Sequence, residues 1–238
     1  MPLTYAYKQW DSEFFGFQVV DILGSDDTGM LPFIMRELHL ENYRLAYWKI
    51  DPEDKNSIRS AEKANAFYAD KRTTLLISIK SEINGPINMQ IEKYTGSINE
   101  DLISLAIQSG EYSRFKNDIM FPENTFEKIY TIWIKRSIEE NYAKEIFVAK
   151  EDNKIIGFVS VGEIDVKRAE IDQIAVDKNY RRKKIGKELI QAAINWANEN
   201  NYTELQVATQ KRNITACKFY TACNFKIEKE ELIYHIWL

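Results

Sequence analysis

The sequence predicts an α/β protein with two successive domains. Segments with helical spacing of apolar residues alternate with apolar, strand-like segments along the chain, an order typical of layered helix-and-sheet structures. The 238 residues are 45% hydrophobic and 13% aromatic, which is enough apolar material to bury a substantial core. Residues 82–88 contain Gly85 and Pro86, which interrupt regular structure. We therefore expect an N-terminal α/β domain at residues 1–86 and a second domain at residues 87–238.

In the first domain, the pattern predicts two helices among three strands. One helix covers residues 31–42, and apolar residues at positions 58, 61, 64 and 66 indicate the other. Runs of apolar and aromatic residues indicate the strands, which are predicted at residues 14–22, 44–50 and 73–79.

The second domain begins with helices and continues with a hairpin. A helix is predicted at residues 99–109, and an irregular loop at 113–124. A long helix follows, because apolar residues recur at helical spacing between Phe126 and Ile138. The remaining elements are predicted as strands at residues 146–150, 154–163 and 168–176, a helix at 187–200, a strand at 204–208, a helix at 214–223, and one or two strands within 226–237.

Charge and composition exclude several kinds of function. The 32 basic and 36 acidic residues give a formal net charge of -4, which argues against nucleic acid as a partner. No apolar run reaches the roughly 20 residues of a membrane span, and the first residues lack the features of a signal peptide, so we expect a cytoplasmic protein without membrane insertion. Cys217 and Cys223 are expected to be reduced. With two cysteines and two histidines in the chain, we expect no metal site.

A basic turn between a strand and a helix is the most informative stretch of the chain. A strand-like stretch with apolar residues at 171, 174, 175 and 176 precedes it, and an amphipathic helix follows it. Five of the seven residues from Arg181 to Lys187 are cationic. The first N–H groups of a helix have no partner within the helix, and the helix dipole adds positive potential there. The turn is either a solvated basic surface or, as its place before a helix favours, a site for phosphate or pyrophosphate.

The residues of this turn resemble motif A of the GNAT acetyltransferases, in which Arg/Gln-x-x-Gly-x-Gly/Ala wraps the pyrophosphate of coenzyme A. The matching stretch is Val176-x-x-x-Tyr180-Arg181-x-x-Lys184-Ile185-Gly186-x-x-Leu189. Lys184 replaces the middle glycine of the motif. The resemblance implies a GNAT fold, preceded here by a smaller, partial-GNAT-like α/β domain, and acetyl-CoA as the acetyl donor. The implied cofactor-binding residues of the turn are Arg181, Arg182, Lys183, Lys184, Ile185, Gly186 and Lys187.

A second segment resembles another conserved stretch of the GNAT acetyltransferases. It reads Asn213-x-x-Ala216-x-x-x-Tyr220-x-x-x-Asn224-Phe225, with Asn224 in place of the usual glycine. The resemblance implies that Asn213 binds the cofactor and that Tyr220 is the general acid that protonates the departing thiolate. It also implies a bulge in strand 168–176, where the backbone of Ile174 and Val176 pairs with the pantetheine arm.

The general base is left open among three carboxylates. Glu170 occupies the place where some GNAT enzymes carry a catalytic glutamate, and Glu163, at the end of the preceding strand, is its rival. Asp172 is a third candidate, since alternation along a strand puts it on the face of Glu170. All three can equally be solvated carboxylates, with water taking the proton from the amine.

Stretches at both ends and in the middle of the chain resemble the dTDP-fucosamine N-acetyltransferases, a group within the GNAT enzymes. They are Trp10-x-x-x-Phe14-Phe15-Gly16, Ser113-Arg114-Phe115 and Leu205-Gln206-Val207-Ala208-Thr209-Gln210. The resemblance implies that the acceptor is the amine of a nucleotide-linked amino-dideoxy sugar. Arg114 is then either the residue that binds the nucleotide diphosphate or, equally, an exposed arginine on a mobile loop. A guanidinium suits a diphosphate because it donates two parallel hydrogen bonds. A homodimer is a possible assembly.

Two other readings remain open. The chain is either a GNAT enzyme for another primary amine, such as a peptide N-terminus, an aminoglycoside or a polyamine, or a non-catalytic module that binds coenzyme A. The first predicts turnover that does not depend on a nucleotide, and the second predicts binding without turnover.

Overall fold

A computed structural model describes residues 2–79 and 91–238 of the chain, which divides by its internal contacts into two units. Unit 1 contains Met1–Thr73 and Lys229–Leu238, and unit 2 contains Thr74–Glu228. The predicted link at residues 82–88 and the domain boundary at 86/87 fall outside the described residues. Residues 229–238, which the sequence assigned to the second domain, group with unit 1. Strands β4 and β10 therefore each have residues in both units.

Unit 1 is a mixed sheet in which β2 pairs with β1 and with β3, and β3 pairs with the C-terminal part of β10. The β2–β3 pair is parallel, and the other two pairs are antiparallel. The elements are β1 (Thr4–Tyr7), α1 (Gln9–Phe15), β2 (Gln18–Leu23), α2 (Leu31–Leu40), β3 (Tyr43–Ile50), α3 (Lys55–Lys63), β4 (Phe67–Ser78) and β10 (Lys226–Trp237).

The core of unit 1 lies between this sheet and the helices α2 and α3. Leu31 and Leu38 of α2 and Ala61 of α3 are buried against sheet residues that include Trp48. Asp54 caps α3, because its side chain accepts a hydrogen bond from the N–H of Ser57 at 3.0 Å. These helices and strands follow the predicted order.

The predicted strand at residues 14–22 is wrong in its first part. Residues 9–15 form α1, and only residues 18–23 form strand β2. Gly16 ends the helix in a left-handed conformation, with φ of 71°, and its N–H donates a hydrogen bond to the oxygen of Ser12. A run of aromatic residues suits either a helix or a strand, and glycine in this conformation is a common helix end.

Unit 2 contains the turn that the sequence singled out. Its strands lie in the order β4–β9–β8–β7–β6–β5. The elements are β5 (Ile91–Lys93), α4 (Glu100–Ser109), α5 (Arg114–Asn117), α6 (Thr125–Glu139), β6 (Glu145–Glu151), β7 (Lys154–Glu163), β8 (Arg168–Val176), the short 3-10 helix η2 (Lys178–Tyr180), α7 (Ile185–Glu199), β9 (Glu204–Gln210) and α8 (Ile214–Ala222).

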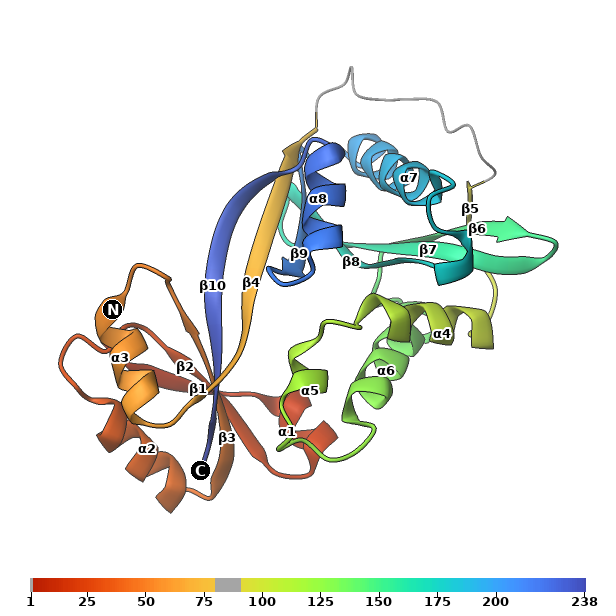
Figure 1. Ribbon diagram of the computed structural model, residues 1–238. Coiled ribbons are helices and arrows are strands. Elements are labelled where there is room, and N and C mark those ends of the chain that lie inside the picture. The colour runs from red at the N-terminus through yellow and green to blue at the C-terminus, as the bar shows by residue number, and fades with distance from the viewer. Residues whose placement is uncertain (1, 80–90) are drawn as a thin grey trace. The chain divides into compact units, whose positions relative to one another are not determined.

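Helices cover both faces of the unit 2 sheet (Figure 1). On one face, α7 and α8 pack on alternate strand residues, including Val159 and Ile171. On the other face, α4 and α6 pack on the intervening residues, including Phe158 and Ala175. The side chains of β7 and β8 thus alternate between two cores, and each strand residue can be assigned to the α7 face or the α4 face.

Strand β8 carries a bulge and then loses one of its neighbours. Ser160 of β7 pairs with Gln173, but the next residue, Val161, pairs with Ile171, so Asp172 is the extra residue. The parallel ladder between β8 and β9 ends at the pair Ile171–Val207, although both strands continue. The predicted bulge in strand 168–176 is therefore present. Beyond it, one backbone edge of β8 has no ladder with β9.

No helix within residues 2–79 and 91–238 is long and apolar enough to span a membrane.

Candidate active site

The turn before α7 presents a run of unpaired backbone N–H groups. Within the described part of the chain, the N–H groups of residues 181–186 have no hydrogen-bond acceptor. Arg182 and Lys184 both adopt the left-handed conformation, with φ of 67° and 65°. Such alternation in a turn directs successive N–H groups toward one side and forms a concave anion site. The dipole of α7, a helix of 15 residues, adds positive potential at the same point.

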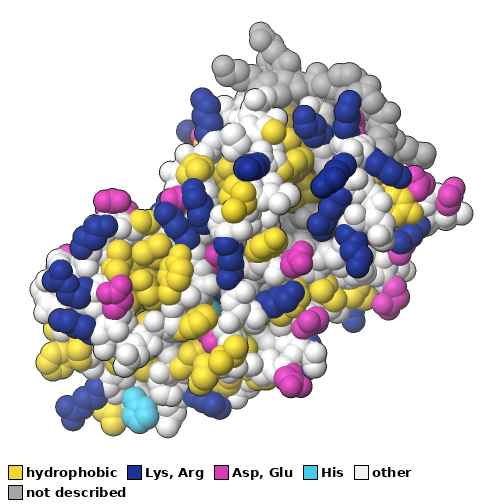
Figure 2. Space-filling model, viewed as in Figure 1, with side chains coloured by type: hydrophobic (Ala, Val, Ile, Leu, Met, Phe, Trp, Pro, Cys, Tyr) yellow, Lys and Arg dark blue, Asp and Glu magenta, His cyan; other side chains and the backbone are white. Residues whose placement is uncertain are grey.

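Cations surround these N–H groups. The side chain of Arg181 is directed toward β8, because its Nε donates a hydrogen bond to the main-chain oxygen of Val176 at 3.1 Å. Lys183 lies over the ring of Tyr180, with Nζ 4.8 Å from the ring centre, and 3.8 Å from Glu151. The side chains of residues 182, 184 and 187 are exposed, and Figure 2 shows lysine and arginine gathered over this part of unit 2. Ile185 differs, because its side chain is buried in the core, so only its backbone faces the turn.

Three elements meet at Gly186. A Cβ atom on Gly186 would lie 3.1 Å from Cζ of Phe219 in α8 and 3.8 Å from Cγ2 of Val176 in β8. Glycine therefore allows the start of α7 to approach α8 and the end of β8 closely. Val176 and Ile174 are half-buried and pack on the α7 face. The predicted cofactor residues of β8 and of the turn are thus brought together.

Asn213 and Tyr220 lie on α8. Asn213 caps the helix, because its side chain accepts a hydrogen bond from the N–H of Ala216 at 3.0 Å. Tyr220 is buried, with ring centres 5.4 Å from Phe219 and 5.9 Å from Phe225. Burial raises the pKa of Tyr220 above its ordinary value, and the nearby thiols of Cys223 and Cys217 add to this. The phenol therefore stays protonated through the neutral range.

Glu170 and Asp172 form a carboxyl pair beside the bulge. Burial and the hydrogen-bonded neighbour Glu170 raise the pKa of Asp172 to about 8. Asp172 is an exposed residue as a whole, so the desolvation concerns its carboxyl group, which lies against β7 at Gly162. A Cβ atom on Gly162 would lie 3.2 Å from the Asp172 carboxylate, so glycine at this position leaves room for the carboxyl group. Two neighbouring carboxyl groups can share one proton, and the raised pKa of Asp172 keeps that proton on the pair near neutral pH.

Glu163, the predicted rival of Glu170, lies apart from this pair. In the β7–β8 register Gly162 pairs with Glu170, whereas Glu163 pairs with Ala169, so Glu163 faces the α7 side of the sheet and Glu170 the other. The Glu163 carboxylate accepts a hydrogen bond from the hydroxyl of Tyr202 at 2.6 Å. That bond raises the pKa of Tyr202 to about 12.

Arg114 lies at the start of α5, a short helix within the segment predicted to be an irregular loop. Ser113 caps this helix through the N–H of Phe115. The guanidinium of Arg114 lies over the Phe115 ring, with Cζ 4.4 Å from the ring centre. The loop just before α5 is joined to the loop after β9, because Arg212 donates a hydrogen bond to the main-chain oxygen of Tyr112 at 2.8 Å.

One buried polar residue of β8, Gln173, is not indicated by any sequence pattern. Gln173 is 7% exposed, and neither its Oε1 nor its Nε2 has a hydrogen-bond partner within the described residues. The lack of hydrogen-bond partners for this carboxamide cannot be seen in the sequence, because it depends on how distant segments pack around β8.

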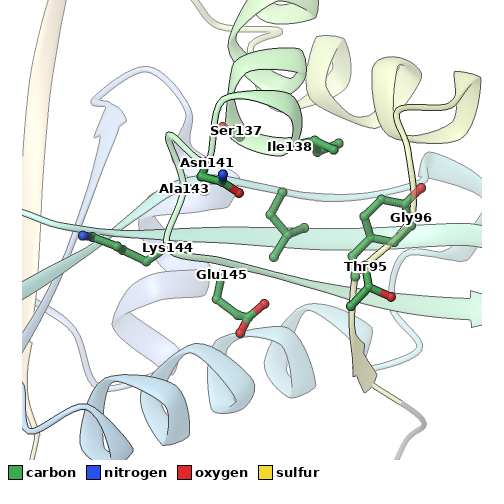
Figure 3. A pocket seen from close by; sticks show the side chains of 10 residues that line it. Thr95, Gly96, Ser137, Ile138, Asn141, Ala143, Lys144 and Glu145 are labelled. Atoms are coloured by element: carbon green, nitrogen blue, oxygen red, sulfur yellow. The ribbon is translucent and has the colours of Figure 1, made fainter.

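A cavity of about 200 Å³ lies elsewhere in unit 2, at the end of α6 and the start of β6. Figure 3 shows its lining, which includes Asn141, Lys144 and Glu145. None of the predicted site residues lines it.

Comparison with known proteins identifies the family. The model of the Acetyltransferase (GNAT) family matches residues 109–225, which include β8, the turn, α7 and Tyr220. The chain belongs to the GNAT acetyltransferase family. Acetyl-CoA is the acetyl donor of GNAT enzymes.

A solved structure supports the GNAT fold over nearly the whole chain. A GCN5-related N-acetyltransferase from Sphaerobacter thermophilus has a TM-score of 0.65 and 12% identical residues, and the match covers 97% of this chain and 75% of that one. The predicted fold class, a mixed α/β GNAT fold, is confirmed.

Curated GNAT relatives differ in how much of the chain they match. Streptothricin acetyltransferase A of Bacillus subtilis is 38% identical over 91 residues, which are 38% of this chain and 53% of that protein. The dTDP-fucosamine acetyltransferase of Escherichia coli is 29% identical over 128 residues, covering 53% of this chain and 54% of that protein. The chain thus matches about half the length of these two relatives. The spore coat polysaccharide biosynthesis protein SpsD of B. subtilis is 20% identical over 242 aligned positions, covering 99% of this chain and 83% of that protein.

Proposed function

We propose that this chain transfers the acetyl group of acetyl-CoA to the amine of a nucleotide-linked amino-dideoxy sugar. The observation that carries the acetyl-transfer part is the turn before α7, with its unpaired N–H groups and its cations. The acceptor class rests on the resemblance of residues 10–17, 113–115 and 205–210 to dTDP-fucosamine N-acetyltransferases. Two relatives with sugar-related names, one of them matching nearly the full chain, support it.

In this proposal the turn binds the diphosphate of acetyl-CoA. The backbone N–H groups of residues 181–186 donate to the phosphate oxygens, and Arg181, Arg182, Lys183, Lys184 and Lys187 neutralise their charge. The backbone of Ile174 and Val176, on the edge of β8 beyond its ladder with β9, pairs with the pantetheine arm. Asn213 supports this site from the start of α8. Such fixed placement removes orientational freedom from the reaction and lowers its barrier.

Tyr220 acts as the general acid. Acetyl-CoA supplies a thioester whose C–S bond breaks as the C–N bond to the acceptor amine forms. Its nearness to this site supports the assignment, because Tyr220 follows Phe219 on α8 and the ring of Phe219 lies against Gly186. Its phenol, which burial keeps protonated, donates its proton to the departing sulfur.

The Glu170–Asp172 pair acts as the general base. A protonated amine must lose a proton before it can act as a nucleophile. The nitrogen loses a second proton as the amide product forms. A carboxyl group with a pKa of about 8 is a far better proton acceptor than an ordinary aspartate. Its place at the bulge puts it at the point where β8 and β9 cease to pair. Glu163 is a weaker candidate, because it faces the opposite side of the sheet and is bonded to Tyr202.

Arg114 holds the nucleotide diphosphate of the acceptor. Its guanidinium lies over the Phe115 ring, and a planar guanidinium can donate two parallel hydrogen bonds to a phosphate group. Binding energy from this remote group orients the amine at the thioester, so it raises catalytic rate as well as affinity.

The test compares two acceptors with acetyl-CoA, followed by release of free thiol. A dTDP-linked 4-amino-4,6-dideoxyhexose should be acetylated with a far higher kcat/KM than the free amino sugar. Arg114→Ala should remove most of that difference. Lys116→Ala is the matched control, since Lys116 is another cation of α5, placed over Phe126, and it should retain the preference.

Other results would change the assignment in defined ways. Equal kcat/KM values for the linked and free sugars would contradict the nucleotide-sugar acceptor and leave acetyl transfer standing. Turnover of a peptide, a polyamine or an aminoglycoside alone would assign a different amine. An amine-bearing antibiotic belongs in that panel because of the streptothricin acetyltransferase relative. Binding of acetyl-CoA without turnover of any amine would indicate a non-catalytic module.

A further inference from the structure

Gln173 carries an unmet hydrogen-bonding capacity in the middle of unit 2. A carboxamide has two donor hydrogens on Nε2 and two acceptor lone pairs on Oε1. Gln173 is 93% buried, and neither atom has a partner within the described residues. Buried polar groups of folded proteins are hydrogen-bonded in the great majority of cases, because leaving one unpaired is unfavourable. We therefore expect the unpaired carboxamide to form hydrogen bonds with a ligand.

The register of β8 places Gln173 on the face of the carboxyl pair. Gln173 pairs with Ser160 and Glu170 pairs with Gly162. Ser160 and Gly162 are two residues apart on β7, so their partners project from the same face of the sheet. This is the α4 face, since Ala175, the next residue on that side, packs with α4 and α6. Gln173 thus stands directly after the bulge residue Asp172, between the proton-accepting pair and the α4 core.

The backbone of Gln173 is held by a hydrogen bond, whereas its carboxamide has no partner within the described residues. Its N–H donates a hydrogen bond to the buried hydroxyl of Ser160 at 3.1 Å. This bond holds the bulge in place and leaves the carboxamide as the part of the residue with free hydrogen-bonding groups. A residue that is fixed at its backbone and unpaired at its tip is suited to bind a ligand with little reorganisation.

We propose that Gln173 binds the acceptor, and this rests on the acetyl transfer proposed above. Its Oε1 accepts a hydrogen bond from a hydroxyl on the carbon next to the reacting amine, and its Nε2 donates to an oxygen on the same side of the acceptor. The residue therefore selects amines with a neighbouring hydroxyl, the chemistry of an amino sugar, over simple alkyl amines. It sets the position of the amine relative to Glu170 and Asp172.

The test uses Gln173→Met, which keeps the length and nearly the volume of the side chain and removes both polar atoms. On the dTDP-linked amino sugar, kcat/KM for the acceptor should fall at least tenfold, with KM for acetyl-CoA unchanged within twofold. With an acceptor analogue that lacks the neighbouring hydroxyl, parent and variant should agree within about twofold. Gln191→Met is the matched control: Gln191 lies on α7, and its Nε2 donates to Asn195 at 2.8 Å, so that variant should show the parent's kinetic constants.

Thermal unfolding of the ligand-free protein gives a second, independent readout. Removing an unpaired carboxamide should leave Tm unchanged or raise it. A Tm lowered by several degrees would mean that the carboxamide is bonded within the protein, and it would overturn the proposal, as would an unchanged kcat/KM for the acceptor. If the parent acetylates another amine of the panel instead of the nucleotide sugar, the proposed acceptor fails, and the same comparison on that amine and its analogue without the hydroxyl decides the role of Gln173.

Discussion

The Nε atom of Arg181 donates a hydrogen bond to the main-chain oxygen of Val176 at 3.1 Å. This bond joins the first cation of the turn to the last residue of β8. The two parts of the proposed cofactor site, the diphosphate turn and the strand edge for the pantetheine arm, are therefore linked by a direct contact. A ligand that pairs with the edge of β8 therefore lies next to the N–H groups at the start of α7.

Lys184 should tolerate glycine better than alanine. Its φ of 65° places a non-glycine residue in the left-handed region, which is disfavoured by roughly 1–2 kcal/mol for residues with a Cβ atom. Lys184→Gly removes that strain, and Lys184→Ala keeps it, while both remove the charge. We expect Tm of Lys184→Gly to equal or exceed that of the parent, and to exceed that of Lys184→Ala. Both variants should bind acetyl-CoA more weakly than the parent. A lower Tm for glycine than for alanine would contradict this account of the turn.

Tyr220→Phe should lower turnover by about a hundredfold or more, because it deletes the proposed proton donor. The ring is retained, so its packing against Phe219 and Phe225 survives and affinity for acetyl-CoA should stay nearly constant. Steady-state kinetics and calorimetry of acetyl-CoA binding check the two parts. Turnover at the parent rate would make Tyr220 a packing residue only.

Asp172 should make the fold less stable as pH rises. Its pKa is about 8 in the folded protein and about 3.9 in an unfolded chain. The folded state therefore binds more protons between these values, and stability falls as pH rises from about 4 to about 8. Asp172→Asn removes this dependence. The Tm of the variant should match the parent near pH 4 and exceed it at pH 8 to 9. An equal difference at both pH values would contradict the raised pKa.

The same variant tests the proposed base. In the parent, kcat/KM for the amine should rise with pH to a limb near pH 8, where the carboxyl pair loses its shared proton. In Asp172→Asn the limb should move to lower pH, because Glu170 then has no carboxylate neighbour. An unmoved limb would mean that ionisation of the amine alone sets the profile and that the pair is not the base.

Most elements of unit 2 could be predicted from local patterns. The helix α4 starts after Asn99, which caps it through the N–H of Leu102, and the hairpin turns at residues 151–153 as expected, with Asp152 and Asn153 in left-handed conformations. The pattern predicts one or two strands within residues 226–237, and the structure has a single long strand there, β10. The strands β1 and β5 were missed because each is only three or four residues long. The sequence carries too little periodicity over such lengths.

The candidate site was predictable where neighbouring residues make it and not where distant ones do. The turn at residues 181–186 and the cap at Asn213 follow from local order in the sequence. The side of the sheet on which Glu163 lies depends on the register of β7 against β8, and its bond to Tyr202 joins residues 39 positions apart. The approach of the Asp172 carboxyl to Gly162 and to Glu170, where its pKa is raised, depends on the bulge. Such relationships appear only once the strands are paired.

Calorimetry of acetyl-CoA binding tests the central claim, that the turn before α7 holds the diphosphate. The comparison is between the parent and the double variant Arg181→Glu, Lys184→Glu, with thermal unfolding to confirm that both proteins are folded. We predict that the double variant binds acetyl-CoA more than tenfold more weakly, a loss of at least about 1.4 kcal/mol. Unchanged affinity in a folded double variant would contradict the account.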